Sequence, residues 1–447
     1  MKKVAIASFV VVLVLISSCF TIRVSAQNKI NHKIEVLNKN GFNVTYNSHN
    51  LPAKIVGNGE MQIVDAQKAL VYLVSKQADE SEMKETIENL IDIFDSPTKQ
   101  KALEGTTFSY SFELNIITSK LDLNITLAKL SIILMDKLAS SQDNHSSKTI
   151  LKLINNQDIR ININEEGRYK LKDISLGSDG VLISLRDVNG DKNSLNIGLF
   201  KIIGEESENL VFEEIRAFYN EKDKNIDSKL TISSIVLSDH STKIKMNDIL
   251  FYSNHIYANE MLRSTNRVSF GEFMLNQNYL SSDVRQNIDL KETHIEFFVD
   301  KIPYKKYKNL MKAVEEYDDE IFSEVFEDFF LEFSKNQSTI VSKAEAANYV
   351  VDDSKIFEKL KYEAVFDLNK NFSMNKLENL KDIFEKVDIK IDLDKNSAQK
   401  ITKFMRDIED ISFVDSGDLE LKRLRIELKD GLYINGKKIL KLEELNF

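Results

Sequence analysis

Short turn sequences recur along this chain between stretches in which apolar and polar residues alternate. Between residues 157 and 202 these turn sequences are Glu165-Glu166-Gly167, Ser178-Asp179-Gly180 and Asn189-Gly190. Asn-Gly and Asp-Gly pairs favour the tight turns that join neighbouring antiparallel strands. Alternation puts every second side chain on the same face of a strand. This part of the chain is therefore predicted to form an antiparallel meander.

The same signals close the chain, at Asp430-Gly431 and Asn435-Gly436. Two turns so close together predict three short strands that finish the edge of a sheet. Apolar side chains near the C-terminus are expected to act there as a hydrophobic clasp: Ile439, Leu440, Leu442, Leu445 and Phe447. Further strands are predicted at 41–64 around a turn at Leu51-Pro52, and at 106–134, 229–239 and 292–300.

Helical periodicity appears between these strand-like runs, first over residues 65–94. In the last third, three segments share one plan: a strand reaches an aspartate, and a polar loop then leads into an amphipathic helix. They are 297–314 with Asp300, 365–384 with Asp367 and 390–408 with Asp392. Aspartate near a helix start suits N-capping, which is the preferred interpretation of the three residues. The alternative is a row of carboxylates that binds a cation or a basic partner.

Together these patterns predict an α+β fold of curved antiparallel β-sheets, with amphipathic helices packed on one face. The most loop-like stretch, 140–148, is the best candidate for a domain boundary. We expect a signal peptide or membrane anchor over 1–26, an N-terminal α+β domain over 27–148, a β-rich meander region over 149–290, and a C-terminal α+β region with repeated strand-helix units over 291–447.

One helical segment, 313–336, carries a phenylalanine-rich apolar stripe opposite an acidic back. The stripe consists of Ile321, Phe322, Val325, Phe326, Phe329, Phe330 and Phe333. The simpler interpretation is a helix that packs this stripe into the core. The alternative is a groove that receives an acyl chain or a partner helix. In that case we expect Phe326 and Phe330 in the core, with Phe329 and Phe333 as the ligand-binding candidates.

The N-terminus has the form of an export segment. Lys2 and Lys3 precede a charge-free run from 4 to 22, and the small-residue pattern before Gln27 offers a cleavage site after Ala26. Three fates compete: cleavage after Ala26, lipid attachment at Cys19, or retention as a membrane anchor. Each predicts an extracytoplasmic protein in the bacterial periplasm. Cys19 is the only cysteine, so a body cleaved after Ala26 would have no disulfide and no thiol chemistry.

Composition and motifs narrow the classes of function. The net charge of −10 argues against nucleic acid as a partner. The six histidines are scattered without a zinc-binding spacing, and no Gly-x-Ser-x-Gly elbow or Walker loop is present. With only 14 glycines and 3 prolines, the chain has little material for glycine-lined phosphate loops. No catalytic residue, metal site or cofactor is predicted.

Five features of the chain together resemble the YdgA-like family of bacterial envelope proteins of unknown function. They are the apolar N-terminal segment, the early "NGFNVTYNSHNLPAKIVGNGEMQI", the hairpin-rich middle, the strand-helix units and the closing "IELKDGLYINGKKI". The resemblance covers most of the exported chain. It implies an extracytoplasmic location and membrane association, and it supplies no catalytic residues.

Two functions from different classes follow from the sequence. The preferred one is a non-enzymatic envelope protein that binds a lipid or a partner protein in an apolar groove. The alternative is a hydrolase whose acid and base are carboxylates assembled from distant segments. The sequence predicts contact with the membrane through the N-terminal segment, and it does not indicate an oligomeric state.

Overall fold

The computed structural model describes residues 27–51, 54–74, 102–115, 118, 120–140, 151–178, 181–204, 208–222, 225–278, 285–316, 319–372, 380–404 and 412–441. The export segment over 1–26, with the lipidation candidate Cys19, lies outside these residues, as does most of the expected loop at 140–148. The chain divides into two compact units, residues 1–192 and 193–447. This division differs from the expected boundaries at 148 and 290, since residue 290 lies inside a strand, Arg285–Pro303, that pairs with a strand on each side.

Unit 1 contains a small antiparallel sheet. Its strand β3 pairs with β1, β2 and β4, the sheet continues through β5, β6, β7 and β10, and β8 and β9 form a hairpin. The strands are β1 (Phe42–Val44), β2 (Asn47–Leu51), β3 (Lys54–Ile63), β4 (Thr107–Asn115), β5 (Leu121–Lys129), β6 (Arg160–Asn164), β7 (Tyr169–Leu171), β8 (Ile174–Ser178), β9 (Val181–Arg186) and β10 (Asn189–Gly190). The helices are α2 (Ala66–Val74) and α5 (Ile132–Ser140), with further helical turns over 27–39 and 151–155.

Two glycines of β3 allow the core of unit 1 to close. A Cβ on Gly57 would lie 2.5 Å from the ring of Phe112, and one on Gly59 would lie 2.0 Å from the carbonyl oxygen of Thr45. The Tyr110 hydroxyl donates to that same oxygen at 2.7 Å, and burial raises the pKa of Tyr110 to about 12. The short "GNG" sequence is therefore required by close packing at this point.

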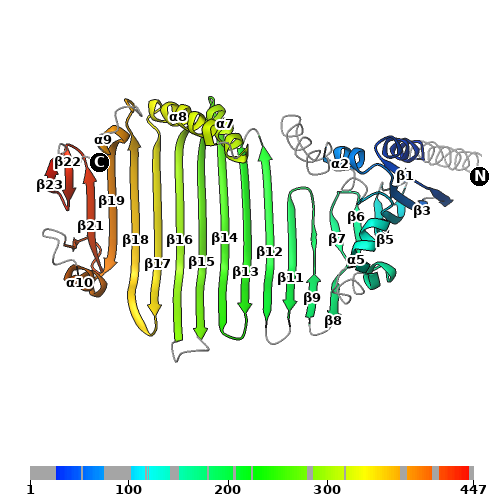
Figure 1. The fold of residues 1–447 in the computed structure, drawn as a ribbon, viewed down its shortest axis with the longest axis horizontal. Coiled ribbons are helices and arrows are strands. Elements are labelled where there is room, and N and C mark those ends of the chain that lie inside the picture. The colour runs from blue at the N-terminus through cyan, green and yellow to red at the C-terminus, as the bar shows by residue number, and fades with distance from the viewer. Residues whose placement is uncertain are drawn as a thin grey trace, which may run out of the picture. The chain divides into compact units, whose positions relative to one another are not determined.

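Unit 2 is built on one long antiparallel meander (Figure 1). Strands β11 to β19 follow one another across the sheet in chain order. The sheet continues from β19 through β21, β22 and β23, and the short strand β20 also pairs with β21. The strands are β11 (Ser194–Ile203), β12 (Asn209–Lys222), β13 (Asn225–Ser238), β14 (Thr242–Ala258), β15 (Met261–Asn278), β16 (Arg285–Pro303), β17 (Thr339–Val351), β18 (Ser354–Leu368), β19 (Phe384–Asp394), β20 (Val414–Asp415), β21 (Leu421–Leu428), β22 (Gly431–Ile434) and β23 (Lys437–Lys441). The helices are α7 (Tyr304–Glu316), α8 (Asp319–Lys335), α9 (Leu380–Ile383) and α10 (Lys395–Phe404). The predicted fold class is confirmed in its coarse form, a largely antiparallel β structure with some helices.

Most of the turn signals that fall on described residues form turns. Gly167 takes a φ of 75° between β6 and β7, and Asn435 and Gly436 take φ angles of 50° and 81° between β22 and β23. The prediction for Asn189-Gly190 is wrong, because these residues form β10 and pair with β7. The residues at 52–53 and 179–180 lie outside the described residues, as do most of the predicted helix at 65–94 and the clasp residues Leu442, Leu445 and Phe447.

The three aspartates of the strand-helix units do not cap helices. Each strand runs past its aspartate, so the carboxylate sits within the sheet and finds a partner on a neighbouring strand. Asp300 lies 3.0 Å from Arg263, Asp367 accepts a hydrogen bond from Thr339, and Asp392 pairs with Arg423. The cap of α10 is Asp394, which accepts from the backbone N–H of Ser397 at 3.0 Å. The capping prediction is therefore wrong for the three residues named.

We expect a chain that ends after Leu428 to unfold at a lower temperature or to be less soluble than the full chain. Leu428 is 2% exposed and pairs with Leu432, so the truncation uncovers its side chain and the unpaired edge of β21. The measurement is the midpoint of thermal unfolding by circular dichroism. Equal midpoints and equal solubility would show that β22 and β23 do not protect this edge.

Candidate functional site: the apolar face of the sheet

A continuous row of apolar side chains crosses the sheet of unit 2. Residues directly opposite each other in neighbouring antiparallel strands point to the same side of the sheet. These pairs connect ten residues, one from each strand: Leu195, Ala217, Leu230, Phe251, Val268, Ile295, Ala344, Tyr362, Ile391 and Leu424. We call the side that carries this row the apolar face. At about 4.8 Å between strands, the row is roughly 40 Å long.

The adjacent row of residues points to the opposite side of the sheet, which we call the charged face. It runs through Phe218, Lys229, Tyr252, Arg267, Glu296, Lys343, Glu363, Lys390 and Arg425. Glu363 lies 3.7 Å from Lys343 and 3.1 Å from Lys390. A shift of one residue in any strand would move its charges onto the apolar face, so the two rows together fix the register of these long strands.

The apolar face continues across a line where strict alternation breaks. Four successive strands have two polar or glycine residues between two apolar ones, at 212–215, 232–235, 246–249 and 270–273. Glu214 and Asp248 take left-handed φ angles of 50° and 54° at this line. The rings of Phe270 and Phe273 nevertheless lie 6.3 Å apart on one side of the sheet. The alternation is therefore shifted by one residue, and the apolar face extends on both sides of the line.

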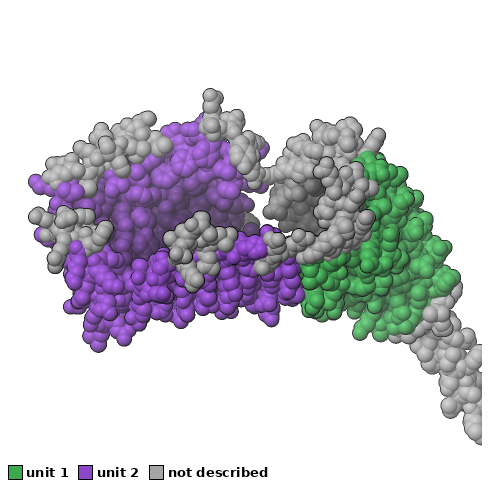
Figure 2. All heavy atoms as spheres, turned by 60° about the horizontal axis from the view of Figure 1, so that its bottom comes forward, with its two compact units in different colours: residues 1–192 green, residues 193–447 purple. Residues whose placement is uncertain are grey.

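Four large side chains of the apolar face are accessible to solvent, whereas Ile232 and Ile249 of the same face are buried. Leu237, Phe251, Ile295 and Phe297 are 43% to 45% exposed. Figure 2 shows that the surface of unit 2 is hollowed on the side turned toward the viewer. Large apolar side chains that gather on one face and stay exposed are typical of a binding surface.

Helices α7 and α8 pack against one end of the apolar face. Phe333 of α8 is 5% exposed and forms a core cluster with Leu262, Val299, Ile302 and Leu368 of the sheet. Figure 1 shows both helices at the end of the sheet where β16 finishes and β17 begins. Most of the length of the strands therefore lies beyond the cover of these two helices.

The phenylalanine stripe is placed differently from the prediction. Phe326, expected in the core, is 37% exposed, whereas Phe333, a ligand-binding candidate, is sealed in the core cluster. Phe329, the other candidate, is half-buried, and its ring stacks on Phe333 with centroids 5.3 Å apart. Phe330 is half-buried against the same cluster. Burial increases along α8 toward its C-terminal end, rather than around the helix as the sequence pattern suggested.

A cluster of polar side chains interrupts the apolar face on β14 and β15. The Ser253 hydroxyl donates to Asn266 Oδ1 at 2.7 Å and lies 2.9 Å from His255 Nε2. Asn266 Nδ2 donates to the buried Ser264 hydroxyl at 2.9 Å. We call these four residues the polar cluster. The sequence analysis missed them, because they come together only through the pairing of β14 with β15.

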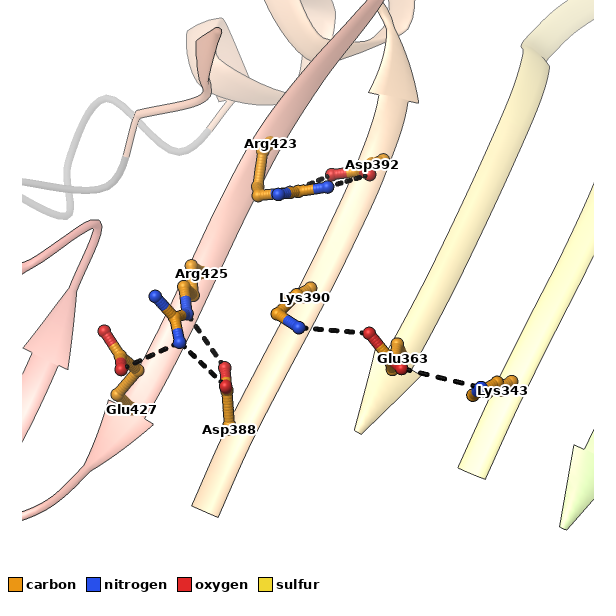
Figure 3. A network of polar contacts seen from close by, with 8 residues as sticks. All are labelled: Lys343, Glu363, Asp388, Lys390, Asp392, Arg423, Arg425 and Glu427. Carbon is orange, nitrogen blue, oxygen red and sulfur yellow. Dashed lines mark hydrogen bonds and ion pairs between the residues drawn. The ribbon is translucent and has the colours of Figure 1, made fainter. Parts of the chain in front are cut away.

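The charged face holds an ion-pair network between β19 and β21 (Figure 3). Arg425 donates two hydrogen bonds to Asp388, at 2.9 and 2.8 Å, and lies 3.1 Å from Glu427. The side chains of Asp388 and Glu427 are 8% and 5% exposed. Arg423 likewise donates two hydrogen bonds to the carboxylate of Asp392, both at 2.7 Å, so this pair is also bidentate. Such bidentate pairs fix geometry as well as adding energy.

The carboxylates of this network differ from those that the alternative hydrolase would need. Hydrogen bonds from Arg425 lower the pKa of Asp388, and a hydrogen bond from Lys390 lowers the pKa of Glu363. A general acid requires a carboxyl group whose pKa is raised. These ion pairs therefore fit a structural role. Among the residues that the structure describes, no group of three or more acidic, histidine or cysteine side chains is arranged to hold a metal ion.

The candidate site is therefore the apolar face of the sheet, including the polar cluster. The sequence analysis had placed it on α8 instead, at Phe329 and Phe333. Within the described ranges of the chain, no helix is long and apolar enough to span a membrane. No protein-family model, no curated protein and no solved structure matches the chain.

Proposed function

We propose that this chain is a non-enzymatic binding protein that holds the acyl chains of a lipid against the apolar face of unit 2. The observation that carries the proposal is the uninterrupted apolar row across ten strands, from Leu195 to Leu424. A row of this kind offers an acyl chain contacts on successive strands, up to its end at Leu424, which is buried at 7% exposed. Its length of roughly 40 Å exceeds what a single compact pocket would need.

Part of the apolar face is exposed, which favours a ligand-binding surface over a closed hydrophobic core. An unoccupied apolar surface of this size is unfavourable in water, and covering it gains free energy in proportion to the area buried. The helices α7 and α8 pack against only one end of the strands. The proposal also includes amphipathic helices that cover one face of a curved sheet. The contacts of α8 with the core cluster support this part.

We also propose that the protein is exported and lies beside a membrane of the bacterial envelope. The apolar segment before Gln27 has the sequence pattern of an export signal or anchor. A bacterial envelope protein placed beside a membrane would meet lipid, which agrees with an apolar binding face and with the resemblance to the YdgA-like family.

A charge placed in the middle of the apolar row tests the proposal. We expect Val268→Asp to weaken binding of the fluorescent hydrocarbon diphenylhexatriene by tenfold or more, because the ligand would bury an unpaired carboxylate. The matched control is Ser269→Asp, the next residue of β15, which lies on the charged face opposite His294. Circular dichroism establishes that both variants fold. Equal binding by the two variants, or no binding by the unaltered protein, would contradict the proposal.

A further inference from the structure

The polar cluster lies within apolar surroundings on the same face. In the pairing of β14 with β15, the row on one side of Ser253 and Asn266 is Phe251 with Val268. Beyond His255 on the other side, Leu262 belongs to the core cluster under α7 and α8. The hydrogen-bonding groups of the cluster are therefore a polar island, framed on both sides by apolar side chains.

The hydrogen bonds of the cluster leave one acceptor unused. Because the Ser253 hydroxyl donates to Asn266, the ring nitrogen Nε2 of His255 must donate to Ser253, and Nδ1 is then an acceptor. This Nδ1 is buried and has no hydrogen-bond partner among the described residues. A buried polar atom without a partner costs stability. Asp227 Oδ1, Asp289 Oδ1 and Thr293 Oγ1 of the same sheet share this condition, so Nδ1 points to a ligand only together with the hydroxyl and amide groups beside it.

The charge of the surroundings limits what the cluster can bind. The two rows of paired residues that contain the polar cluster include no lysine, arginine, aspartate or glutamate on β13 to β16; the rows are Ser228–Ser253–Asn266–Phe297 and Ile226–His255–Ser264–Val299. Burial lowers the pKa of His255, so its ring is neutral at pH 7. A carboxylate or phosphate held at this place would be desolvated without a cation to pair with it. An uncharged group with hydroxyl or ester oxygens meets no such penalty.

Building on the proposed function, we propose that the polar cluster receives the uncharged glycerol headgroup of an acylglycerol, whose acyl chain lies along the apolar row. Ser253 and Asn266 are half-buried residues on this side of the sheet. The ligand class is thus a neutral amphiphile, and anionic lipids are disfavoured at this position.

The test compares 1-monooleoylglycerol with oleate at pH 8 as competitors of diphenylhexatriene on the full chain. We expect the monoacylglycerol to compete at a lower concentration than oleate. Asn266→Leu and His255→Phe should each weaken monoacylglycerol binding about 3- to 10-fold, because each removes hydrogen-bonding capacity. The readout is the ratio of monoacylglycerol affinity to hydrocarbon affinity, which should fall in both variants and stay unchanged in a variant of the charged face. Asn254→Leu is the matched control, on the charged face of β14 opposite Thr265.

Thermal unfolding of the free protein distinguishes a binding role of His255 from a purely structural one. If the role were structural, losing the imidazole would lower the unfolding temperature. We expect His255→Phe to unfold at the same temperature or higher, since it removes a buried unsatisfied nitrogen, while its monoacylglycerol binding falls. Hydrocarbon binding without a preference for monoacylglycerol over oleate would overturn the inference and leave the proposed function standing, as would unchanged monoacylglycerol binding by both variants. Absence of hydrocarbon binding would overturn the proposed function itself.

Discussion

Replacing Phe333 with alanine is expected to lower the free energy of unfolding by about 3 to 5 kcal/mol, whereas the same change at Phe326 is expected to cost less than about 1 kcal/mol. The two residues lie on the same helix and have the same chemistry. Phe333 is 5% exposed within the core cluster, and Phe326 is 37% exposed. Truncation at Phe333 leaves a cavity against Leu262 and Leu368, while truncation at Phe326 leaves a space that water can fill.

The measurement is urea unfolding of both variants, followed by circular dichroism. The two alanine variants control for each other, since both remove a phenylalanine ring from α8. Phe329→Ala should fall between them, because Phe329 is half-buried beside the cluster. Similar losses for Phe326 and Phe333 would show that burial does not increase along α8 in the way described.

The second large effect is expected at the ion-pair network. Arg425→Met should lower the free energy of unfolding by about 3 to 5 kcal/mol at pH 7, because Asp388 stays buried after its bidentate partner is removed, while Glu427 keeps its contact with Lys429 at 2.9 Å. The matched control is Arg216→Met. Arg216 pairs with Glu214 at 3.0 Å, but the two side chains are 65% and 57% exposed. An exposed pair of this kind contributes at most about 1 kcal/mol.

This prediction also has a pH dependence with a definite sign. In the unaltered protein, Arg425 lowers the pKa of Asp388 below the ordinary value of 3.8. The stability that this pair contributes is present above about pH 4 and is lost as the pH falls through the lowered pKa. In Arg425→Met the buried Asp388 lacks that cation, so protonation of its carboxylate relieves the cost of burying the charge. The difference in unfolding free energy between the two proteins should therefore shrink from pH 7 to pH 4. A difference that is constant over this range would contradict the assignment of the loss to buried charge.

The sequence predicts local features of this fold, such as tight turns, better than it predicts which residues meet across neighbouring strands. Tight turns such as Asn435-Gly436 are specified by two neighbouring residues, and the backbone φ angles there agree. The aspartates at the strand ends were misassigned because a capping residue and a residue in a cross-strand ion pair have the same local sequence. Asp392 pairs with Arg423, which is distant in the sequence, and only the register of β19 with β21 brings the two together.

The apolar face escaped the sequence analysis for a related reason. The row from Leu195 to Leu424 takes one residue from each strand, so no local pattern shows it. The pairs of polar residues at 213–214 and 233–234 look like places where a strand ends, although the strands continue through them with a shifted alternation. The recurrence of this pattern in four successive strands indicates that the strands are long and aligned. The phenylalanine stripe is contiguous in the sequence, but only its C-terminal part packs on the core cluster, through Phe329, Phe330 and Phe333.

The most direct test of the account is native mass spectrometry of the full chain purified from bacterial membranes. If the apolar face of unit 2 holds acyl chains, the protein should carry additional masses that match lipids, and Val268→Asp should reduce them while Ser269→Asp does not. Organic extraction of the same sample would then identify the bound lipid and its headgroup. A protein that shows only its own mass, both as purified and after incubation with a total lipid extract, would contradict the claim that this face is a lipid-binding site.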